Sequence, residues 1–440
     1  MKRVKIHQCS FRVALFALGV MPIAHATTFE VNTTADLPDD GGGLTTCHTS
    51  AGTCSLRAAI MKANQVDGTD SVHIPAGTYT LTIPPSGGDG DDTGDLDITT
   101  SIAITGAGAD RTIIDGNATD RVFDISVGQF AGLTGVTVRN GLQSDNGGGI
   151  RNAGILTMDH STIEDNHTFA NGITGDGAGI YSTGSLDIFF STIRSNQVTG
   201  LGNGGGIASY GTAVVRTSTI SSNGANNGGG IFVLSHSQYF YVIDSTLSGN
   251  AAYNDGGGIF NIEAAGSSDV VGLYSTSVLG NDASSDADGM GEGGGIYAPG
   301  INGSRFIVVN TIVADNTINA RSAFDDCVGG IEAYGANLYT MAVPFGCTVG
   351  GNGTDAMRQV SLETIGPLQD NGGPTFTHAL LVNSEAIDGT NGQACVDPNG
   401  TPLSTDQRDA PRTVGARCDI GAYEYGATVD VIFRNGFDSP

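Results

Sequence analysis

The sequence predicts an all-β protein that folds as a right-handed parallel β-helix, a solenoid of about ten coils. Two repeated features predict this fold. A Gly-Gly-Gly-Ile or Gly-Ala-Gly-Ile tetrapeptide occurs six times, beginning at Gly147, Gly177, Gly204, Gly228, Gly256 and Gly293. About twenty residues after each tetrapeptide, a Ser/Thr-rich segment ends in an asparagine: Asn166, Asn196, Asn223, Asn250, Asn281 and Asn316. Successive asparagines are 27 to 35 residues apart, which is typical of units that are stable only when stacked.

The residues before each asparagine predict parallel strands. The positions eight and ten residues before it are apolar in every repeat: Met158, Ile188, Val215, Val242, Leu273 and Val308 at eight, and Leu156, Leu186, Ala213, Phe240, Val271 and Phe306 at ten. This two-residue period is that of a strand with one buried face. With glycine at 68 of 440 positions, a helical repeat is excluded on propensity. Right-handed crossovers are the strongly preferred hand for parallel strands.

The glycines and asparagines have physical roles in such a solenoid. Glycine triplets suit corners that need a positive φ or a close approach of neighbouring coils. An asparagine can adopt the left-handed conformation and can hydrogen-bond to the equivalent asparagine of the next coil. We therefore predict a structural asparagine ladder, with a ligand-binding row as the alternative.

The N-terminus predicts export. Residues 1–26 contain four basic residues, an apolar run over 13–23 and an Ala-His-Ala site before Thr27, as in a secretory signal peptide. No other stretch of the chain reaches the 18 apolar residues of a membrane helix. Loss of the four basic residues changes the formal net charge from −26 to −30. Such an acidic protein is unsuited to nucleic acid, and it suits acidic polysaccharides only with a bridging cation.

The cysteines also fit an oxidising compartment. Six remain after Cys9 leaves with the signal peptide, and they form three sequence-local pairs: Cys47 with Cys54, Cys327 with Cys347, and Cys395 with Cys418. An even number of cysteines in an exported chain predicts disulfides. Zinc is the alternative, but the spacings and the lack of neighbouring histidines disfavour it.

Both ends of a β-helix need a cover, because they expose apolar coils and unpaired strands. Ser55 is a favourable helix N-cap, and the apolar residues that follow it lie on one helical face: Leu56, Ala59, Ile60 and Ala63. We expect this short helix to cover the first coil. The predicted organisation is a signal peptide (1–26), an N-terminal cap (27–68), β-helix repeats (69–320), a disulfide-bearing C-terminal cap or anchor-type region (321–425) and a tail (426–440).

Motifs at both ends carry a family resemblance. Residues 54–60, CSLRAAI, resemble the N-terminal signature of exported bacterial β-helix proteins with a CSLREA motif, although Ala58 stands where that signature has glutamate. Residues 366–375, 386–388, 406–408 and 418–424 resemble the choice-of-anchor Q region that ends such proteins, and the repeats are similar to those of polymorphic outer-membrane proteins. The resemblance implies a cell-surface or extracellular right-handed β-helix of a diderm bacterium. It implies no reaction, because the group is defined by architecture.

Candidate catalytic residues come from outward strand positions, because common hydrolase and nucleotide-binding motifs are absent from the sequence. Asp159 and Asp187 are expected on adjacent coils, roughly 8 Å apart between Cβ atoms, with Arg216 one coil further on. That separation suits an inverting carboxylate pair, and solvated surface carboxylates are the alternative. Asp325 and Asp326 resemble the paired carboxylates of polygalacturonase-like enzymes, but no Gly-His-Gly accompanies them.

The same outward face turns aromatic in the later coils, with Tyr239, Tyr241 and Tyr274. Apolar patches of this kind mark ligand surfaces or docking sites. Two explanations remain open at this stage. Residues 320–425 fold back and cover the patch, or the tyrosines bind sugar rings or a partner protein.

One acidic segment could hold a metal. Its aspartates are interleaved with glycines: Asp89, Asp91, Asp92, Asp95 and Asp97. Closely spaced carboxylates are the ligands that calcium prefers, whereas a solvated acidic loop is the alternative. Calcium is the one cofactor that the sequence leaves open.

Together these features favour an exported protein of recognition or adhesion, binding a polysaccharide or a surface protein. The first alternative is a polysaccharide lyase or glycoside hydrolase, because pectinase-like enzymes share this fold. The second is a structural component of the cell envelope.

Overall fold

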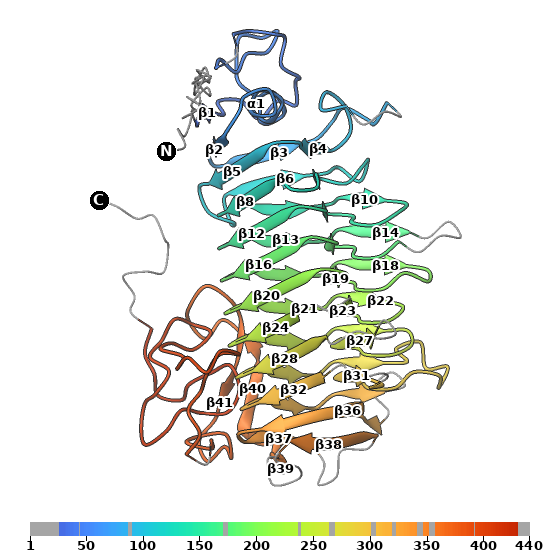
Figure 1. The fold of residues 1–440 in the computed structure, drawn as a ribbon, viewed down its shortest axis with the longest axis vertical. Helices are drawn as coiled ribbons and strands as arrows, with labels where there is room; N and C mark the ends of the chain where they lie inside the picture. Colours follow the sequence, from blue (N-terminus) through green and yellow to red (C-terminus); the bar gives the residue numbers. More distant parts are fainter. Residues whose placement is uncertain are drawn as a thin grey trace, which may run out of the picture.

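The computed structural model is a right-handed parallel β-helix of about nine turns, which confirms the predicted fold class. The structure describes residues 26–43, 45–86, 90–169, 175–235, 239–263, 269–300, 305–318, 323–340, 346–351, 357–390 and 392–429. Its coils stack along the long axis of the molecule, from helix α1 at one end to strand β39 at the other (Figure 1). Each regular coil contributes four short strands, which pair in parallel with the strands of the neighbouring coils and build three sheets.

Sheet A has 20 strands in two adjacent columns. Its first column contains β4 (Leu96–Ile98), β7 (Phe123–Ile125), β11 (Ile150–Asn152), β15 (Ile180–Ser182), β19 (Ile207–Ser209), β23 (Ile231–Ser235), β27 (Ile259–Glu263) and β31 (Ile296–Ala298). Its second column contains β1 (Thr28–Glu30), β2 (Thr69–Ile74), β5 (Ser101–Gly106), β8 (Phe130–Thr134), β12 (Ile155–Asp159), β16 (Ser185–Phe189), β20 (Thr212–Arg216), β24 (Tyr239–Ile243), β28 (Val270–Tyr274) and β32 (Arg305–Val309). The columns merge in β36 (Cys327–Tyr334), which pairs with β31, β32 and β38 (Cys347–Gly351).

Sheets B and C complete each coil. The 11 strands of sheet B are β3 (Gly77–Thr80), β6 (Thr112–Asp115), β9 (Thr137–Arg139), β13 (Thr162–Glu164), β17 (Thr192–Arg194), β21 (Thr219–Ser221), β25 (Thr246–Ser248), β29 (Ser277–Leu279), β33 (Ile312–Ala314), β37 (Asn337–Tyr339) and β39 (Met357–Gln359). The 8 strands of sheet C are β10 (Leu142–Gln143), β14 (His167–Phe169), β18 (Gln197–Thr199), β22 (Gly224–Ala225), β26 (Ala251–Ala252), β30 (Asp282–Ala283), β34 (Thr317–Ile318) and β35 (Ala323–Phe324).

The core is built from the two apolar columns that the sequence predicts. Leu156 lies in register with Leu186, and Met158 with Ile188. The same register continues from β16 through β20, β24, β28 and β32. All twelve side chains of the two columns are at most 2% exposed. Burial of one large apolar side chain contributes roughly 1.5 to 3 kcal/mol, so this stack is a large part of the stability of the core.

The predicted asparagine ladder runs through the turn between sheets B and C. Each asparagine from Asn166 to Asn281 donates its backbone N–H and its Nδ2–H to Oδ1 of the asparagine in the next coil, at 2.9–3.1 Å. The asparagine side chains are buried, so they satisfy the backbone at a corner that water does not reach. The ladder is therefore part of the scaffold.

The left-handed conformation expected at the asparagines falls one residue earlier. At the six ladder turns, the residues with positive φ are Asp165, Ser195, Ser222, Gly249, Gly280 and Asp315. The glycine triplets meet both needs predicted for them. Gly228 has a φ of 62°, and a Cβ on Gly229 would collide with the carbonyl of Ala251 in the next coil.

Helix α1 (Leu56–Ala63) covers the first coil, as predicted (Figure 1). The Ser55 hydroxyl accepts a hydrogen bond from the Ala58 amide at 3.0 Å, which caps the helix. Ile60 and Ala63 pack into the same core as the strands. Arg57 is buried and pairs with Asp36 at 2.7 Å, so the cap is held by an ion pair as well as by apolar contact.

The C-terminal part extends the solenoid beyond the predicted boundary at residue 320. Parallel pairing continues past residue 320 through β36, β37, β38 and β39. The chain then forms the 3-10 helix η2 (Leu362–Thr364) and the antiparallel strands β40 (Ile365–Gln369) and β41 (Thr377–Leu380). Figure 1 shows this part, in orange and red, beside the lower coils rather than across their end. We call the residues that follow β39, 360–429, the side domain.

Polar contacts dock the side domain on sheet B. Gln407 is buried; its Oε1 accepts a hydrogen bond from Thr246 at 2.6 Å, and its Nε2 donates to Thr219 at 2.9 Å. The Ala422 amide donates to the Ser277 hydroxyl at 3.1 Å. The non-repeated residues therefore cover one side of the solenoid.

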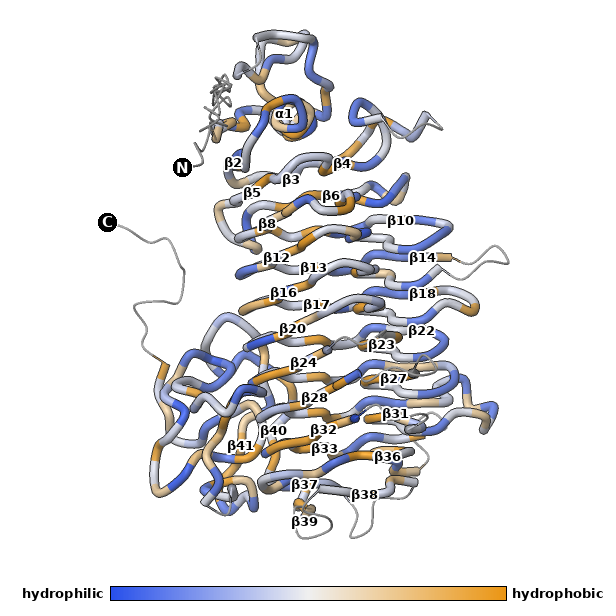
Figure 2. The backbone as a smooth tube through the Cα atoms, viewed as in Figure 1, coloured by the Kyte–Doolittle hydropathy of each residue, from blue (hydrophilic) through white to orange (hydrophobic). Residues whose placement is uncertain are grey.

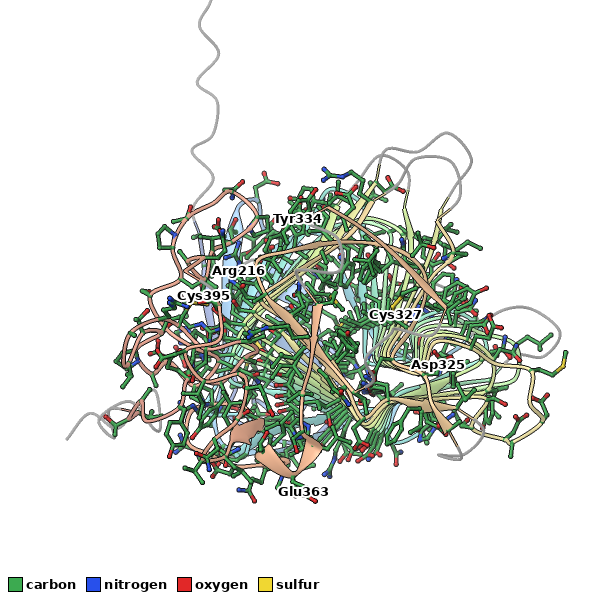
Figure 3. The ribbon with its side chains drawn as sticks, turned by 90° about the horizontal axis from the view of Figure 1, so that it is seen from below. Arg216, Asp325, Cys327, Tyr334, Glu363 and Cys395 are labelled. Carbon is green, nitrogen blue, oxygen red and sulfur yellow. A yellow bond between two sulfur atoms is a disulfide. The ribbon has the colours of Figure 1, made fainter. Side chains whose placement is uncertain are left out.

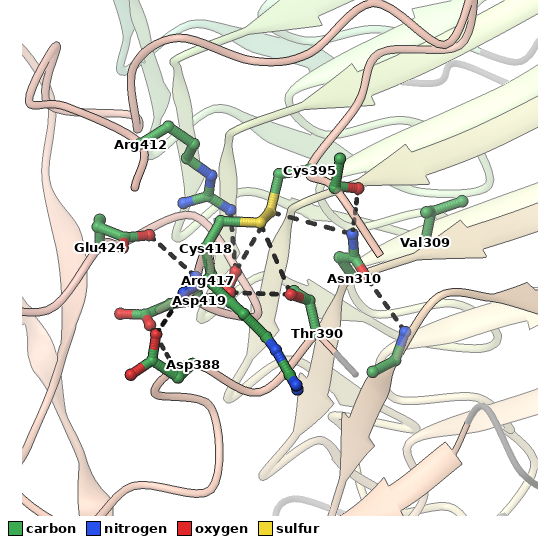
Figure 4. Close-up of a disulfide and its surroundings, with 12 residues drawn as sticks. Val309, Asn310, Asp388, Thr390, Cys395, Arg412, Arg417, Cys418, Asp419 and Glu424 are labelled. Atoms are coloured by element: carbon green, nitrogen blue, oxygen red, sulfur yellow. Dashed lines mark hydrogen bonds between the residues drawn. A yellow bond between two sulfur atoms is a disulfide. The ribbon is translucent and has the colours of Figure 1, made fainter. Parts of the chain in front are cut away.

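All three predicted cysteine pairs are disulfide-bonded: Cys47 with Cys54, Cys327 with Cys347, and Cys395 with Cys418. Figure 4 shows the last of these beside Asn310 of the β-helix. The Asn310 amide donates to the carbonyl of Ala394 at 3.2 Å. This disulfide therefore lies where the side domain meets the coils.

Candidate binding surface on sheet A

The predicted catalytic residues lie on the outer face of sheet A, in its second column. Asp159 ends β12, Asp187 lies within β16, and Arg216 ends β20. Thr157 pairs with Asp187, and Phe189 pairs with Arg216. Asp159 and Asp187 are thus on adjacent coils and two positions apart along the strand.

The two carboxylates have different surroundings. Asp159 accepts a hydrogen bond from the neighbouring His160 ring at 2.8 Å, and that ring stacks on Phe190. Burial raises the pKa of Asp187, and the positive charge of Arg216 opposes that rise. Different environments are what separate an acid from a base in a catalytic pair. The arrangement therefore supplies one half-buried carboxyl beside an arginine, but it does not identify a reaction.

Asp325 and Asp326 have scaffold contacts instead of a catalytic arrangement. Oδ1 of Asp326 accepts hydrogen bonds from the backbone N–H and Nδ2–H of Asn316, both at 3.2 Å, and so ends the asparagine ladder. Its Oδ2 accepts from the Thr340 amide at 2.7 Å. Seen along the axis, Asp325 lies on a different side of the cross-section from Arg216 (Figure 3). These two carboxylates belong to the corner of the coil.

The predicted tyrosines form a cluster in the second column of sheet A, which we call the tyrosine patch: Tyr239, Tyr241 and Tyr274. The rings of Tyr239 and Tyr241 stack with centroids 5.1 Å apart, and Tyr274 meets Tyr241 edge-on at 6.0 Å. Exposure differs within the patch, because Tyr239 is 43% exposed whereas Tyr274 is 8% exposed. Burial raises the pKa of Tyr274 to about 12. One end of the patch therefore faces solvent and the other belongs to the fold.

Within the described residues, the side domain covers this patch only at its edge. Leu403 packs against the cluster formed by Ile243, Tyr274 and Ile307. The other side-domain contacts described above are with sheet B or with Asn310, which lies in the turn between β32 and sheet B. Of the two explanations left open by the sequence, folding back of the C-terminal residues accounts for the buried end of the patch, and Tyr239 stays exposed.

A second aromatic feature, not found from the sequence, follows the first column of sheet A. We call it the aromatic stripe; its members are Tyr181, Tyr210, Phe232, Phe260 and Tyr297. Neighbouring ring centroids are 5.0 to 5.9 Å apart. The two pairs that involve Phe260 are nearly parallel, at 11°. Figure 2 shows hydrophobic residues recurring along the strands of these later coils.

The stripe has a signal in the sequence. Four of its members directly follow the isoleucine of a glycine tetrapeptide, and Tyr210 lies two residues after Ala208, which holds that position in its own coil. Parallel strands in register place such residues above one another. The mutual stacking uses ring faces. Phe232 and Phe260 are nearly buried as a result, and mainly the tyrosines retain exposed surface.

An acidic cluster continues the first column towards the N-terminal end. Its members, Asp95, Asp97 and Asp124, have carboxylate oxygens within 4.8 Å of one another. Asp97 pairs in register with Asp124, which pairs with Arg151, the neighbour of Tyr181 in the stripe. On geometry, this cluster could hold a divalent cation.

Arginines already compensate part of that negative charge. Arg121 lies 3.3 Å from Asp95 and 3.7 Å from Asp124, and Arg151 donates a hydrogen bond to Asp124. Burial raises the pKa of Asp95 to about 7, and Arg121 opposes that rise. A cation would therefore compete with two guanidinium groups.

The predicted calcium segment is thus only partly assembled. Asp95 and Asp97 belong to the acidic cluster, together with Asp124, which the sequence reasoning missed. Asp91 instead accepts a hydrogen bond from the Asn64 amide at 2.8 Å and holds the cap helix. Asp92 is exposed and outside the cluster. Asp89 lies outside the described residues.

Comparison with known proteins gives a fold and no family. No family model matches the chain, and no curated protein matches it. The crystal structure of pectate lyase Pel9A is similar, with a TM-score of 0.51 and 13% sequence identity. The match covers 91% of this chain and 98% of that one. At this identity the likeness shows the β-helix architecture alone.

Within the described residues, no helix has the length and apolar character needed to cross a membrane. Three disulfides are typical of chains that fold in an oxidising compartment.

Proposed function

We propose that the protein is exported and binds a linear polysaccharide along the outer face of sheet A. The main observation that supports this proposal is the tyrosine patch, where the exposed Tyr239 ring stacks on Tyr241 at the surface of a parallel sheet. An exposed tyrosine ring offers a flat apolar surface and a polar hydroxyl. It therefore suits a ligand that has both apolar faces and hydrogen-bonding groups. The secretory signal peptide predicted over residues 1–26 supports export.

The repeat of the surface supports a polymeric ligand. Parallel coils place equivalent positions one strand spacing apart along the axis, about 4.7–4.9 Å. A linear polymer that lies along the axis meets a comparable set of side chains at each coil. On sheet A, Asp187, Arg216 and Tyr239 lie on three successive coils, at different positions along their strands. Hydrogen-bonding groups next to aromatic rings are the usual composition of small-ligand sites.

Charge favours a neutral polysaccharide. The formal net charge is −26 before removal of the signal peptide, and the arginines of sheet A are largely engaged. Arg151 pairs with Asp124, and Arg305 pairs with Glu332. Acidic chains would therefore be repelled unless a cation bridges them.

A binding experiment with cleavage measured in parallel tests this proposal. Mature protein, residues 27–440, is incubated with insoluble neutral and acidic polysaccharides, with and without calcium, and both retention and soluble products are measured. We expect retention on at least one neutral polysaccharide without products. Tyr239→Ala should weaken retention about two- to tenfold, the range expected for one aromatic contact. Tyr253→Ala is the matched control, because Tyr253 is 39% exposed and follows a strand of sheet C.

Polysaccharide cleavage is the second candidate function, and one observation favours it. Asp187, with its raised pKa, lies beside Arg216 on the face where the proposed polymer lies. The similar structure is named a pectate lyase. Asp286→Asn, in a loop on another part of the coil, is the control. Soluble cleavage products that disappear with Asp187→Asn but not with Asp286→Asn would show that the protein is an enzyme. Retention on no polysaccharide would overturn the proposal and favour a protein partner.

A further inference from the structure

A buried carboxylate occupies a core position in the first coil. The side chains of β2 alternate, with Asp70, Val72 and Ile74 buried on the inner face. Asp70 is fully buried and lies in register with Ile102 of β5. An ionised carboxylate at such a position is costly unless it is paired and hydrogen-bonded.

The neighbouring strand offers Asp70 a single donor. The backbone N–H of Thr27 donates to Oδ1 at 2.7 Å. The second oxygen, Oδ2, is buried and has no hydrogen-bond partner among the described residues. Burial raises the pKa of Asp70, and the Thr27 bond only partly opposes that rise. An amide with one hydrogen leaves this carboxylate half satisfied.

The sequence places a proteolytic cut at this same nitrogen. The Ala-His-Ala site over residues 24–26 predicts cleavage before Thr27. Hydrolysis adds one water across the bond between Ala26 and Thr27. The carboxylate stays on Ala26, and the Thr27 nitrogen becomes an amine that takes up a proton and then carries three hydrogens.

We propose that removal of the signal peptide completes the fold, because it frees the Thr27 α-ammonium to pair with the buried Asp70 carboxylate. A charged donor with three hydrogens satisfies a carboxylate better than one amide does, and the opposite charges offset the burial of both. The backbone already holds the nitrogen in place. Thr27 accepts a hydrogen bond from the Ser71 amide at 2.8 Å, and Thr28 pairs with Ser71. Strand β1 therefore reaches full stability only in the processed chain.

Amine labelling tests the pairing directly, because the mature chain has only two amines. These are the Thr27 α-amine and Lys62, the one lysine after residue 26. Lys62 is buried and lies 2.7 Å from Asp39. The folded mature protein is treated with an amine-reactive reagent near neutral pH, and the N-terminal peptide is quantified by mass spectrometry. We expect Thr27 to react about tenfold more slowly than in Asp70→Asn, the change that a one-unit rise in the pKa of the amine produces.

Thermal melting of four chains separates this pairing from general effects. Proteins that begin at Thr27, or at an extra alanine before it, are compared with Asp70 intact and as Asp70→Asn. The extra residue should lower the Tm by on the order of 2 °C in the parent and should have no effect in Asp70→Asn. Glu30→Gln is the control, because Glu30 is exposed and pairs with His73 on the same strands. It should leave the effect of the extra residue unchanged.

Equal labelling of Thr27 in both proteins, or equal Tm values with and without the extra residue, would overturn the proposal. Should Asp70→Asn fail to fold, the comparison of the two N-termini in the parent still decides the question. The inference rests on the export part of the proposed function, because only an exported chain loses residues 1–26. Polysaccharide retention is not expected to change in any of these variants, so the outcome is independent of the proposed binding.

Discussion

The outer faces of sheets A and B are built on the same coils but differ in what covers them. On sheet B, hydroxyls such as those of Thr246 and Ser277 receive the side domain. On sheet A, aromatic rings follow both columns, and the described side-domain residue that packs against them is Leu403. Sheet B therefore has its partner within the chain, whereas the exposed part of sheet A has none among the described residues.

This difference separates structural patches from candidate binding patches. Both faces carry residues that a simple solvated sheet does not need. Contact with the side domain explains those of sheet B and the buried end of the tyrosine patch. What stays unexplained by internal packing is the exposed ring of Tyr239, and for that reason the proposed function rests on it.

The largest expected effect separates the two ends of the tyrosine patch. Tyr274→Ala should reduce the free energy of unfolding by about 3 kcal/mol, because it removes a nearly buried ring and leaves a cavity. Tyr239→Ala should cost less than about 1 kcal/mol, because that ring is 43% exposed. Chemical denaturation of both variants measures the difference. Equal losses would mean that Tyr239 is also part of the fold and would remove the basis for a binding patch.

The next effect concerns the docking of the side domain on sheet B. Gln407→Ala should cost about 2 to 3 kcal/mol, because it leaves buried partners, including the Thr246 hydroxyl, without a hydrogen bond. Limited proteolysis should then cut the side domain before the coils. Gln369→Ala is the matched control, since Gln369 is exposed on β40. Unchanged stability of the Gln407 variant would show that the side domain is held by its apolar contacts alone.

Acidity should strengthen the same docking. Burial raises the pKa of Asp244 to about 7, although Arg412 lies 3.5 Å away, and it raises the pKa of Glu424 to about 7. Their folded pKa values exceed the ordinary ones, so the folded protein holds extra protons between about pH 4 and pH 7. The stability from these groups is full below that window and is lost as the pH rises through it.

Melting curves between pH 5 and pH 8 measure this dependence. We expect a higher Tm at pH 5, and a smaller change with pH in Asp244→Asn. This variant separates the local effect from the repulsion among the many carboxylates of the chain. A Tm that does not vary with pH would show that Arg412 keeps Asp244 ionised.

Features that recur in every coil could be predicted from the sequence. The core columns, the asparagine ladder and the glycine corners are each repeated six times, so each pattern is recognisable even where one repeat has a different residue. The position of the left-handed residue is one residue earlier than predicted. Only Gly249 and Gly280 indicate this position by their residue type. At the other coils, Asp165, Ser195, Ser222 and Asp315 adopt that conformation without a glycine.

Features that depend on unrepeated residues could not be predicted. The aromatic stripe does recur from coil to coil, but it lies outside the predicted columns, because the spacing before each asparagine fixes the second column of sheet A and not the first. The place of Asp124 in the acidic cluster could not be predicted, because Asp124 lies in an early coil that lacks the glycine tetrapeptide. The side domain docks through single contacts such as that of Gln407 with Thr246. Such contacts do not repeat along the sequence, so no periodic pattern predicts them.

The smallest expected effect concerns the acidic cluster at the N-terminal end of sheet A. Addition of calcium, compared with a chelator, should leave the Tm unchanged, because Arg121 and Arg151 already compensate Asp95 and Asp124. Magnesium is the control for general ionic effects. Stabilisation by calcium alone, lost in Asp124→Asn, would contradict this expectation and assign the cluster to a metal. Sheet A would then carry a bridging cation beside its aromatic stripe, and the preference for neutral polysaccharides would no longer follow from the negative charge of the chain.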